Sequence, residues 1–326
     1  MNPLMNLGPL PCVTTPRATT VHYGAPNAFL TPSGPAGVHG GATRSAYRPG
    51  EGSFRPEPDD SPRTRRHRTD DRENPVHIVV INPNTTASMT GLIGESARAV
   101  AAVGTAVTAV NPDMGPASIE SHYDEALSVP GLLAEIARAQ AGEPTADGFV
   151  IACFGDPGLD AARELADGPV VGIAEAAMHA ASFLGRGFSV VTTLGRTAGR
   201  AWDLAERYGM TRFCRTVRAC EIPVLALEDP ASDAFAAIVA ESRCAVVDDG
   251  AEAIVLGCAG MADLAARMTD AVGVPVVDGV AAATKTVEGL VAMGLRTSAR
   301  AEFAPPPPKA YTGLLSDFEI GEPDLC

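Results

Sequence analysis

The sequence predicts an α/β fold made of two pseudo-symmetric, Rossmann-like domains, each built on a parallel sheet, with a ligand-binding cleft between them. Three observations support this prediction. From residue 76 onward, short apolar runs alternate with helix-like segments. The apolar runs are continuous, which is typical of parallel strands that are buried on both faces. Finally, motifs of the first half recur in the same order in the second half, which indicates an internal duplication.

The N-terminal segment has a different character from the rest of the chain. Residues 1–75 contain 12 of the 27 prolines and show no periodic apolar pattern. Such a composition cannot bury enough apolar surface to offset the entropy lost on ordering. We therefore predict that residues 1–75 form a disordered extension.

The elements of the first half follow in order after this extension. We expect strands at 76–81, 106–110, 148–154 and 169–172, and helices at 87–101, 123–140 (with a break at its proline) and 157–166. Three runs of the second half match this series. Residues 188–193 match 77–82, residues 252–260 match the run that ends in "ACFG", and 274–283 match 168–177. We predict a first domain of 76–172 plus about 281–313, a second domain of 173–280, and a tail of 314–326.

Each predicted domain carries a cysteine where one of its strands ends. Cys153 lies in "DGFVIACFGDPG" and Cys258 lies in "EAIVLGCAGM". Ligands of open α/β sheets bind outside the carboxyl ends of the strands, so both thiols are expected to line one cleft. A thiol at a strand end, before a helix, lies near backbone N–H groups and the positive end of the helix dipole. We therefore expect a lowered pKa and available thiolate near neutral pH.

Two thiols related by pseudo-symmetry suit the transfer of a proton between the two faces of one carbon. Racemisation or epimerisation needs an acid and a base on opposite sides. The usual cofactor for such chemistry is pyridoxal phosphate, which needs a Schiff-base lysine. The chain has two lysines, Lys285 and Lys309, and neither is well placed. The seven cysteines form no CxxC motif and no His lies at zinc-finger spacing. We predict no cofactor and no metal.

Charge and hydropathy restrict the partners. The formal net charge is −14, which argues against nucleic acid and anionic membranes as partners. No run of 18 uncharged apolar residues predicts a membrane span. No basic segment followed by an apolar stretch predicts a signal peptide, so the cytoplasm is the predicted location.

Five motifs together resemble one protein family. They are "INPNTTASMT" (81–90), "GPASIESHYDEAL" (115–127), "ACFGDPGLDAARE" (152–164), "VLGCAGM" (255–261) and "PPKAYTG" (307–313). They are similar to the hydantoin/allantoin racemase branch of the aspartate/glutamate racemase superfamily, over about 76–313. The resemblance implies catalytic cysteines from two pseudo-symmetric domains, no cofactor, a cyclic ureide as small-molecule substrate, and assembly into homo-oligomers.

By this resemblance Cys153 and Cys258 are the acid/base pair, and the active site is the cleft between the domains. Amino-acid racemases of the superfamily usually have Asn-Thr after the first cysteine. Here Phe154, Gly155 and Asp156 follow, which favours a cyclic ureide over a free amino acid. The resemblance does not distinguish hydantoins from allantoin.

Further residues are candidates for substrate binding, each with a structural alternative. Asn84 is expected to bind a ring carbonyl or imide, or else to cap the helix that begins near 86. Thr192 and Thr193 could stabilise an enolate or cap a helix. Phe154 could pack on the ring or in the core. Ile119 matches a pocket wall by family position, though its residue type is equally typical of a core.

The backbone beside each cysteine completes the predicted set. Gly155 and Gly260 are expected to let the main chain approach the substrate closely, and Ala259 lies between the second cysteine and its glycine. We interpret the nearby polar cluster as a solvated helix start without a metal role. Its members are Glu120, His122, Asp124 and Glu125.

Two other functions stay open at the sequence level. One is a related isomerase or decarboxylase of the same fold, although the decarboxylases typically keep one cysteine. The other is a ligand-binding regulator that retains the cleft. Loss of optical rotation from one enantiomer of a hydantoin, without added cofactor, distinguishes the racemase from both.

Overall fold

The computed structural model describes residues 75–229 and 232–320, which form two four-stranded parallel sheets. The first sheet has the strand order β2-β1-β3-β4 and the second has the order β6-β5-β7-β8. The strands of the first sheet are β1 (Val76–Ile81), β2 (Thr105–Val110), β3 (Gly148–Ile151) and β4 (Val170–Gly172). Those of the second are β5 (Phe188–Thr192), β6 (Cys214–Ala219), β7 (Ala253–Leu256) and β8 (Val276–Val277). The repeated strand order confirms the predicted α/β fold with two similar parallel sheets.

Helices connect the strands of each sheet in the manner of βαβ units. The first half contains α1 (Ala87–Val100), α2 (His122–Ala141), α3 (Leu159–Leu165) and α4 (Ile173–Ser182). The second half contains α5 (Ala198–Arg207), α6 (Ala234–Val247), α7 (Ala265–Val272) and α8 (Gly279–Ala292). Short 3-10 helices lie at Gly195–Thr197, Val224–Glu228, Ala259–Leu264, Ala301–Phe303 and Gly313–Phe318. In the described residues no helix has both the length and the apolar character needed to cross a membrane.

The predicted break in the second helix is wrong. Helix α2 continues through Pro130, although a proline inside a helix typically costs about 3 kcal/mol. The turns that follow bury Leu132 and Ile136 completely. Burial of each such side chain stabilises by about 1.5–3 kcal/mol, so packing against the sheet outweighs the lost backbone hydrogen bond.

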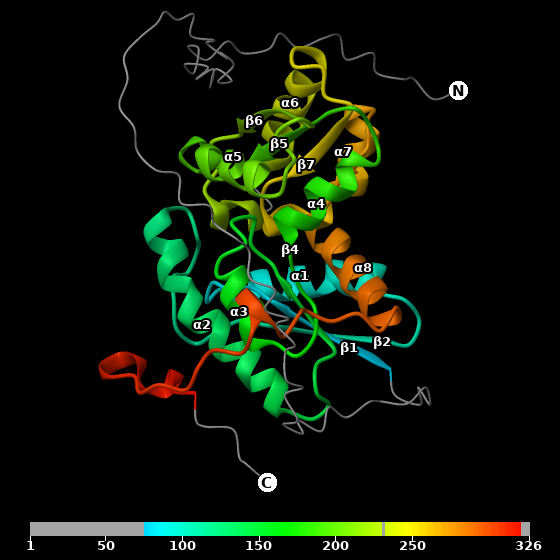
Figure 1. The fold of residues 1–326 in the computed structure, drawn as a ribbon. Helices are drawn as coiled ribbons and strands as arrows, with labels where there is room; N and C mark the ends of the chain where they lie inside the picture. Colours follow the sequence, from blue (N-terminus) through cyan, green and yellow to red (C-terminus); the bar gives the residue numbers. More distant parts are fainter. Residues whose placement is uncertain (1–74, 230–231, 321–326) are drawn as a thin grey trace, which may run out of the picture. The chain divides into compact units, whose positions relative to one another are not determined.

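Helices α4 and α8 join the two halves (Figure 1). Helix α4 packs against β4 of the first sheet and against β5 and β7 of the second, while α8 returns to β1, β3 and β4. The two helices approach closely at their N-termini, since a Cβ on Gly279 would lie 2.7 Å from the carbonyl oxygen of Ile173. One apolar cluster includes Val80 and Val190, and so runs from one sheet to the other.

The domain limits proposed from the sequence stay a prediction. They are 76–172 with about 281–313 for the first domain and 173–280 for the second. Of the predicted extension and tail, residues 1–74 and 321–326 lie outside the described residues.

Candidate active site

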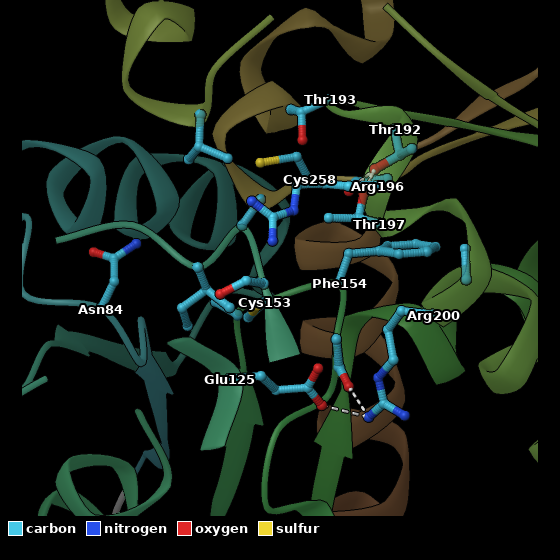
Figure 2. Close-up of a pocket in the computed structure, with 18 of the residues that line it drawn as sticks. Asn84, Glu125, Cys153, Phe154, Thr192, Thr193, Arg196, Thr197, Arg200 and Cys258 are labelled. Carbon is cyan, nitrogen blue, oxygen red and sulfur yellow. Dashed lines mark hydrogen bonds and ion pairs between the residues drawn. The ribbon is translucent and has the colours of Figure 1, made fainter. Parts of the chain in front are cut away.

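A cavity of about 210 Å³ lies at the carboxyl ends of the central strands of both sheets. Asn84 follows β1, Cys153 follows β3, and Cys258 follows β7, while Thr192 and Thr193 lie at the end of β5. Figure 2 shows these five side chains around the cavity. The structure therefore brings both candidate catalytic cysteines to one site, and each arrives from an equivalent strand of its own sheet.

The two cysteines begin turns with the same hydrogen bonds. The N–H of Asp156 donates to the carbonyl of Cys153 (3.0 Å), and the N–H of Met261 donates to the carbonyl of Cys258 (3.2 Å). In each turn the N–H two residues after the cysteine donates to its thiol, from Gly155 in the first turn and from Gly260 in the second. A short, repeated turn thus points one N–H group at each sulfur.

Burial governs the acidity of both thiols. It raises the pKa of Cys153 to about 12, and the N–H of Gly155 offsets the shift in part. The negative charges near Cys153 add to the rise. Burial likewise raises the pKa of Cys258 to about 11, against the N–H of Gly260. The sequence-based expectation of a lowered thiol pKa is therefore wrong, because desolvation of the thiolate outweighs one hydrogen bond.

The side-chain oxygen of Asn84 makes structural hydrogen bonds, whereas its side-chain nitrogen contacts only a weak acceptor among the described residues. Its Oδ1 accepts from the N–H of Thr86 (2.9 Å), the residue that precedes α1, and from Nδ2 of Asn82 (2.9 Å). Its Nδ2 contacts the sulfur of Met89 (3.4 Å), a weak acceptor. The oxygen therefore stabilises the start of the helix, while the nitrogen can donate to a ligand.

The two threonines differ in how far the structure uses their hydroxyls. Thr192 Oγ1 lies 3.1 Å from Oγ1 of Thr197 and 3.3 Å from the carbonyl oxygen of Gly257, so it is held within the turn after β5. The Thr193 hydroxyl makes no hydrogen bond within the described residues, although the side chain is 3% exposed and lines the cavity. Thr193 is accordingly the better placed of the two to meet a ligand.

The apolar candidates line the same cavity. Ile119 and Ala259 form part of its wall, and so does Phe154, which also belongs to the core cluster that joins the sheets. Gly155 lines the cavity, whereas Gly260 is buried beside it, outside the lining residues. The position of Gly260 is explained by its N–H bond to Cys258 and by the close approach of Leu227, whose Cδ1 would lie 3.1 Å from an added Cβ.

Four ionisable cavity residues were absent from the predicted site. These are His122, Glu125, Arg196 and Arg200. Glu125 Oε1 lies 2.6 Å from Nη2 of Arg200, and both side chains are largely buried. Burial raises the pKa of Glu125, and Arg200 opposes that shift. The sequence signal for Glu125 was the acidic cluster at the start of α2, whereas no local pattern marked Arg200.

The interpretation of this cluster as a solvated helix start is therefore wrong for two of its members. Besides Glu125, Glu120 is engaged, because its Oε1 accepts from the N–H of Val224 (2.8 Å) in the other half. Asp124 does stabilise the helix start, since its Oδ2 accepts from the hydroxyl of Ser121 (2.7 Å) and from the N–H of Glu120 (3.1 Å). Among the residues described, no group of three or more His, Cys, Asp or Glu side chains is arranged to hold a metal ion.

Comparison with known proteins gives consistent matches over the folded region. The family model described as Asp/Glu/Hydantoin racemase matches residues 78–287. A hydantoin racemase of Rhizobium meliloti is 52% identical over 238 residues, covering 73% of this chain and 98% of the relative. A hydantoin racemase of Pseudomonas sp. (strain NS671) is 47% identical over 243 residues, covering 74% and 97%.

Solved structures agree with these sequence matches. The allantoin racemase from Klebsiella pneumoniae superposes with a TM-score of 0.73 at 51% identity, covering 75% of this chain and 99% of that one. The allantoin racemase from Pseudomonas fluorescens gives a TM-score of 0.70 at 41% identity, with 73% and 100% covered. A glutamate racemase from Bacillus anthracis, at 16% identity and a TM-score of 0.51, shares the fold.

Proposed function

The chain belongs to the Asp/Glu/hydantoin racemase family, as its five motifs indicated, and we propose that it racemises 5-substituted hydantoins or allantoin. The observation that carries this proposal is the pair Cys153 and Cys258, which reach one cavity from equivalent strands of two sheets. The names of its relatives, hydantoin racemases and allantoin racemases, support the substrate class.

The proposed reaction needs no cofactor. The thiolate of one cysteine removes the proton from C5 of the ring, and the electron pair of that C–H bond moves into the neighbouring carbonyl to form an enolate. The thiol of the other cysteine then gives its proton to the opposite face of C5. One proton leaves the substrate and one arrives, so the thiol and the thiolate exchange places. The opposite enantiomer uses the same steps in the reverse direction.

The surroundings of the thiols suit this chemistry. A thiol of raised pKa is a strong base once it is ionised, which favours removal of a carbon-bound proton. Donors at the cavity wall can stabilise the enolate oxygen. The candidates are Nδ2 of Asn84 and the hydroxyl of Thr193, since neither is committed to a strong acceptor within the described residues. Phe154 and Ile119 supply apolar wall for the ring.

The test is racemisation of pure enantiomers. Each enantiomer of allantoin and of a panel of hydantoins with methyl, isopropyl and benzyl groups at C5 is incubated with dialysed protein and a chelator. Optical rotation is followed against a protein-free blank, which subtracts spontaneous racemisation. We expect rotation to decay to zero and, in D₂O, deuterium to appear at C5.

Other outcomes separate the alternatives. Binding of the ring compounds without turnover supports a ligand-binding regulator. Absence of turnover across the whole panel, or activity that requires added pyridoxal phosphate or metal, would contradict the proposal. A cytoplasmic location and a homo-oligomeric state remain predictions with separate tests.

A further inference from the structure

We propose that Arg200 is a positioning residue that holds the turn of Cys153, and therefore controls one of the two proton-transfer faces and not the other. This inference rests on the proposed function. It concerns a residue of α5, a helix of the second half, that acts on the cysteine of the first half.

The contacts of Arg200 converge on the first turn. Its Nη2 donates to the carbonyl of Gly155 (2.7 Å) and lies 2.6 Å from Oε1 of Glu125 on α2, as the dashed lines in Figure 2 show. The N–H of Gly155 donates to the thiol of Cys153. Gly155 is therefore held through its carbonyl by Arg200 while its N–H holds the sulfur, so movement of the guanidinium would move the donor that faces Cys153.

One donor of the Arg200 guanidinium has no partner within the described part of the chain, so Arg200 does not lie where all its hydrogen-bonding groups would be satisfied. Its Nε is buried and has no partner among the described residues. A buried donor without a partner typically costs about 1–3 kcal/mol, and such groups call for an explanation. The two Nη2 contacts keep the guanidinium at this place in spite of that cost, which is consistent with a role in the reaction.

Glu125 adds an electrostatic reason for the arginine. The carboxylate of Glu125 lies close enough to Cys153 to raise the pKa of the thiol. Arg200 pairs with that carboxylate in a partly buried position, where screening by water is weak. Loss of Arg200 would release the turn and also leave an unpaired negative charge beside the thiolate that has to form.

Among the described residues no cationic side chain donates to the backbone of Cys258–Met261, although Arg196 also lines the cavity. An added Cβ on Gly260 would meet Leu227, Met89 and the Cys258 sulfur. The effect of Arg200 should therefore be confined to steps in which Cys153 is the base.

This asymmetry can be measured in single-cysteine proteins. In the Cys258→Ser protein, C5–H exchange in D₂O depends on Cys153. In the Cys153→Ser protein it depends on Cys258. Arg200→Gln is introduced into each, and exchange of each pure enantiomer is followed by NMR. We expect Arg200→Gln to slow the Cys153-dependent exchange on the order of 10- to 100-fold, as misplacement of a reacting group does, and to leave the Cys258-dependent exchange within about twofold.

Arg218→Gln is the matched control. Arg218 is a second arginine of the second half, on β6, and it pairs with Asp249 and Glu241, outside both turns. It should leave both exchange rates unchanged. Arg200→Lys keeps the charge and should recover part of the lost Cys153-dependent rate. Glu125→Gln keeps the bond between Arg200 and Gly155, and should shift the pH profile of the Cys153-dependent exchange alone to lower pH, since it removes a charge that disfavours the thiolate.

The possible results separate this inference from the proposed function. If neither single-cysteine protein exchanges either enantiomer, the proposed function and this inference both fail. If both exchange, but Arg200→Gln slows the two faces equally or slows neither, the positioning role is wrong and the proposed function stands. The unfolding midpoint in urea is compared for every variant, and an equal loss on both faces with a lowered midpoint identifies a merely structural role.

Discussion

The turns Cys153–Asp156 and Cys258–Met261 follow equivalent strands and repeat the same hydrogen bonds, but different residues hold them in place. In the first turn the buried Asp156 carboxylate accepts from the N–H groups of Ala174 (3.0 Å) and Glu175 (2.9 Å) at the start of α4. It also accepts from the Tyr208 hydroxyl (2.7 Å). In the second turn the corresponding residue is Met261, which is fully buried among apolar side chains.

Helices α4 and α8 occupy equivalent positions in the two halves, but their N-termini are capped by residues from different places in the chain. Helix α8 is capped by its own Asp278, which accepts from the N–H groups of Val280 (3.0 Å) and Ala281 (2.9 Å). The equivalent position before α4 is Gly172, where an added Cβ would lie 2.2 Å from Cγ of Asp156. In the first half the cap therefore comes from the cysteine turn itself.

The difference shows that the duplicated chemistry is supported by two kinds of anchor. The first turn is tied to α4 and to Tyr208 by a buried carboxylate, whose bonds have fixed directions and depend on ionisation. The second turn is held by apolar packing, which has neither property. We therefore expect the Cys153 face to respond more strongly to changes in charge than the Cys258 face, although Glu120 also raises the pKa of Cys258.

The largest expected effect comes from replacing either cysteine, and it tests whether the two thiols serve opposite faces of the substrate. Cys153→Ser and Cys258→Ser should each lower the racemisation rate about 1,000-fold or more, because a hydroxyl is a far weaker acid than a thiol and each pKa unit is worth about 1.4 kcal/mol. Each variant should still exchange one enantiomer in D₂O without inverting it, and the two variants should prefer opposite enantiomers. NMR of each pure enantiomer gives the answer.

Two results would break the assignment of one base to each face. One is that both serine variants exchange the same enantiomer. The other is that one of them still racemises near the wild-type rate.

The second prediction compares the two caps. Asp156→Ala removes three buried hydrogen bonds and places alanine at a φ of +43°, so we expect a loss of about 2–4 kcal/mol in the free energy of unfolding. Asp278→Ala removes an ordinary N-cap, which typically costs about 1–2 kcal/mol. Urea unfolding, followed by the fluorescence of Trp202, the single tryptophan, measures both.

Activity separates these two variants more sharply than stability does. Asp156→Ala should slow exchange at the Cys153 face, whereas Asp278→Ala should leave both faces near the wild-type rate because Asp278 contacts neither turn. Equal loss of activity in the two variants would mean that the hydrogen bonds of Asp156 have no particular effect on Cys153.

A third prediction concerns the space that the Asp156 carboxylate needs in order to cap α4. Gly172→Ala should displace the Asp156 carboxylate and lower the free energy of unfolding by about 1–3 kcal/mol. Gly199→Ala in α5 is the matched control, because its added Cβ would meet no described atom within 4 Å beyond its chain neighbours and the backbone of its own helix. That control should be neutral or stabilise by up to about 1 kcal/mol. A neutral Gly172→Ala would show that Asp156 can cap α4 from another position.

The smallest expected effect is on pH dependence. Burial raises the pKa of Asp156 and of Asp278 to about 6, above the ordinary value of about 3.9 in the unfolded chain. The folded state then binds these protons more tightly, so their stabilising contribution is complete at low pH and is lost as the pH rises through about 6. Between pH 5.5 and 7.5 each group should change the free energy of unfolding by about 1 kcal/mol.

Asp156→Asn and Asp278→Asn should each flatten this slope by a similar amount in urea unfolding at several pH values. Asp156→Asn should also remove an inflection near pH 6 from the Cys153-dependent exchange. Since Asp278 lies outside both turns, an inflection that Asp278→Asn removes instead would contradict the proposed division of roles.

Much of the fold was predictable because local sequence patterns determine where its strands and helices form. The continuous apolar runs gave β1, β2 and β5 with near-correct limits, and their recurrence gave two sheets of one topology. The end of β3 and the continuity of α2 were predicted less accurately. The strand expected at 148–154 ends at Ile151, and the break expected at Pro130 does not occur, because burial of the following turns decides the outcome.

The candidate site was predicted unevenly. Asn84, Ile119 and Thr193 all line the cavity with the two cysteines, since they stand at strand ends or in motifs that the family resemblance identified. Their roles in binding remain predictions. Arg200 and the function of Asp156 were not found, because neither has a local pattern that names its partner.

By itself, the sequence determined which residues are available and in what order: two similar units, each with a cysteine directly after a strand. These features follow from chain order and from a repeat, which exist before the chain folds. The tertiary structure alone decided that Arg200 meets Gly155, 45 positions away, and that Asp156 meets Tyr208, 52 positions away. It also decided that both thiols have a raised pKa, because the degree of burial that sets acidity is a property of the packed chain and not of its local sequence.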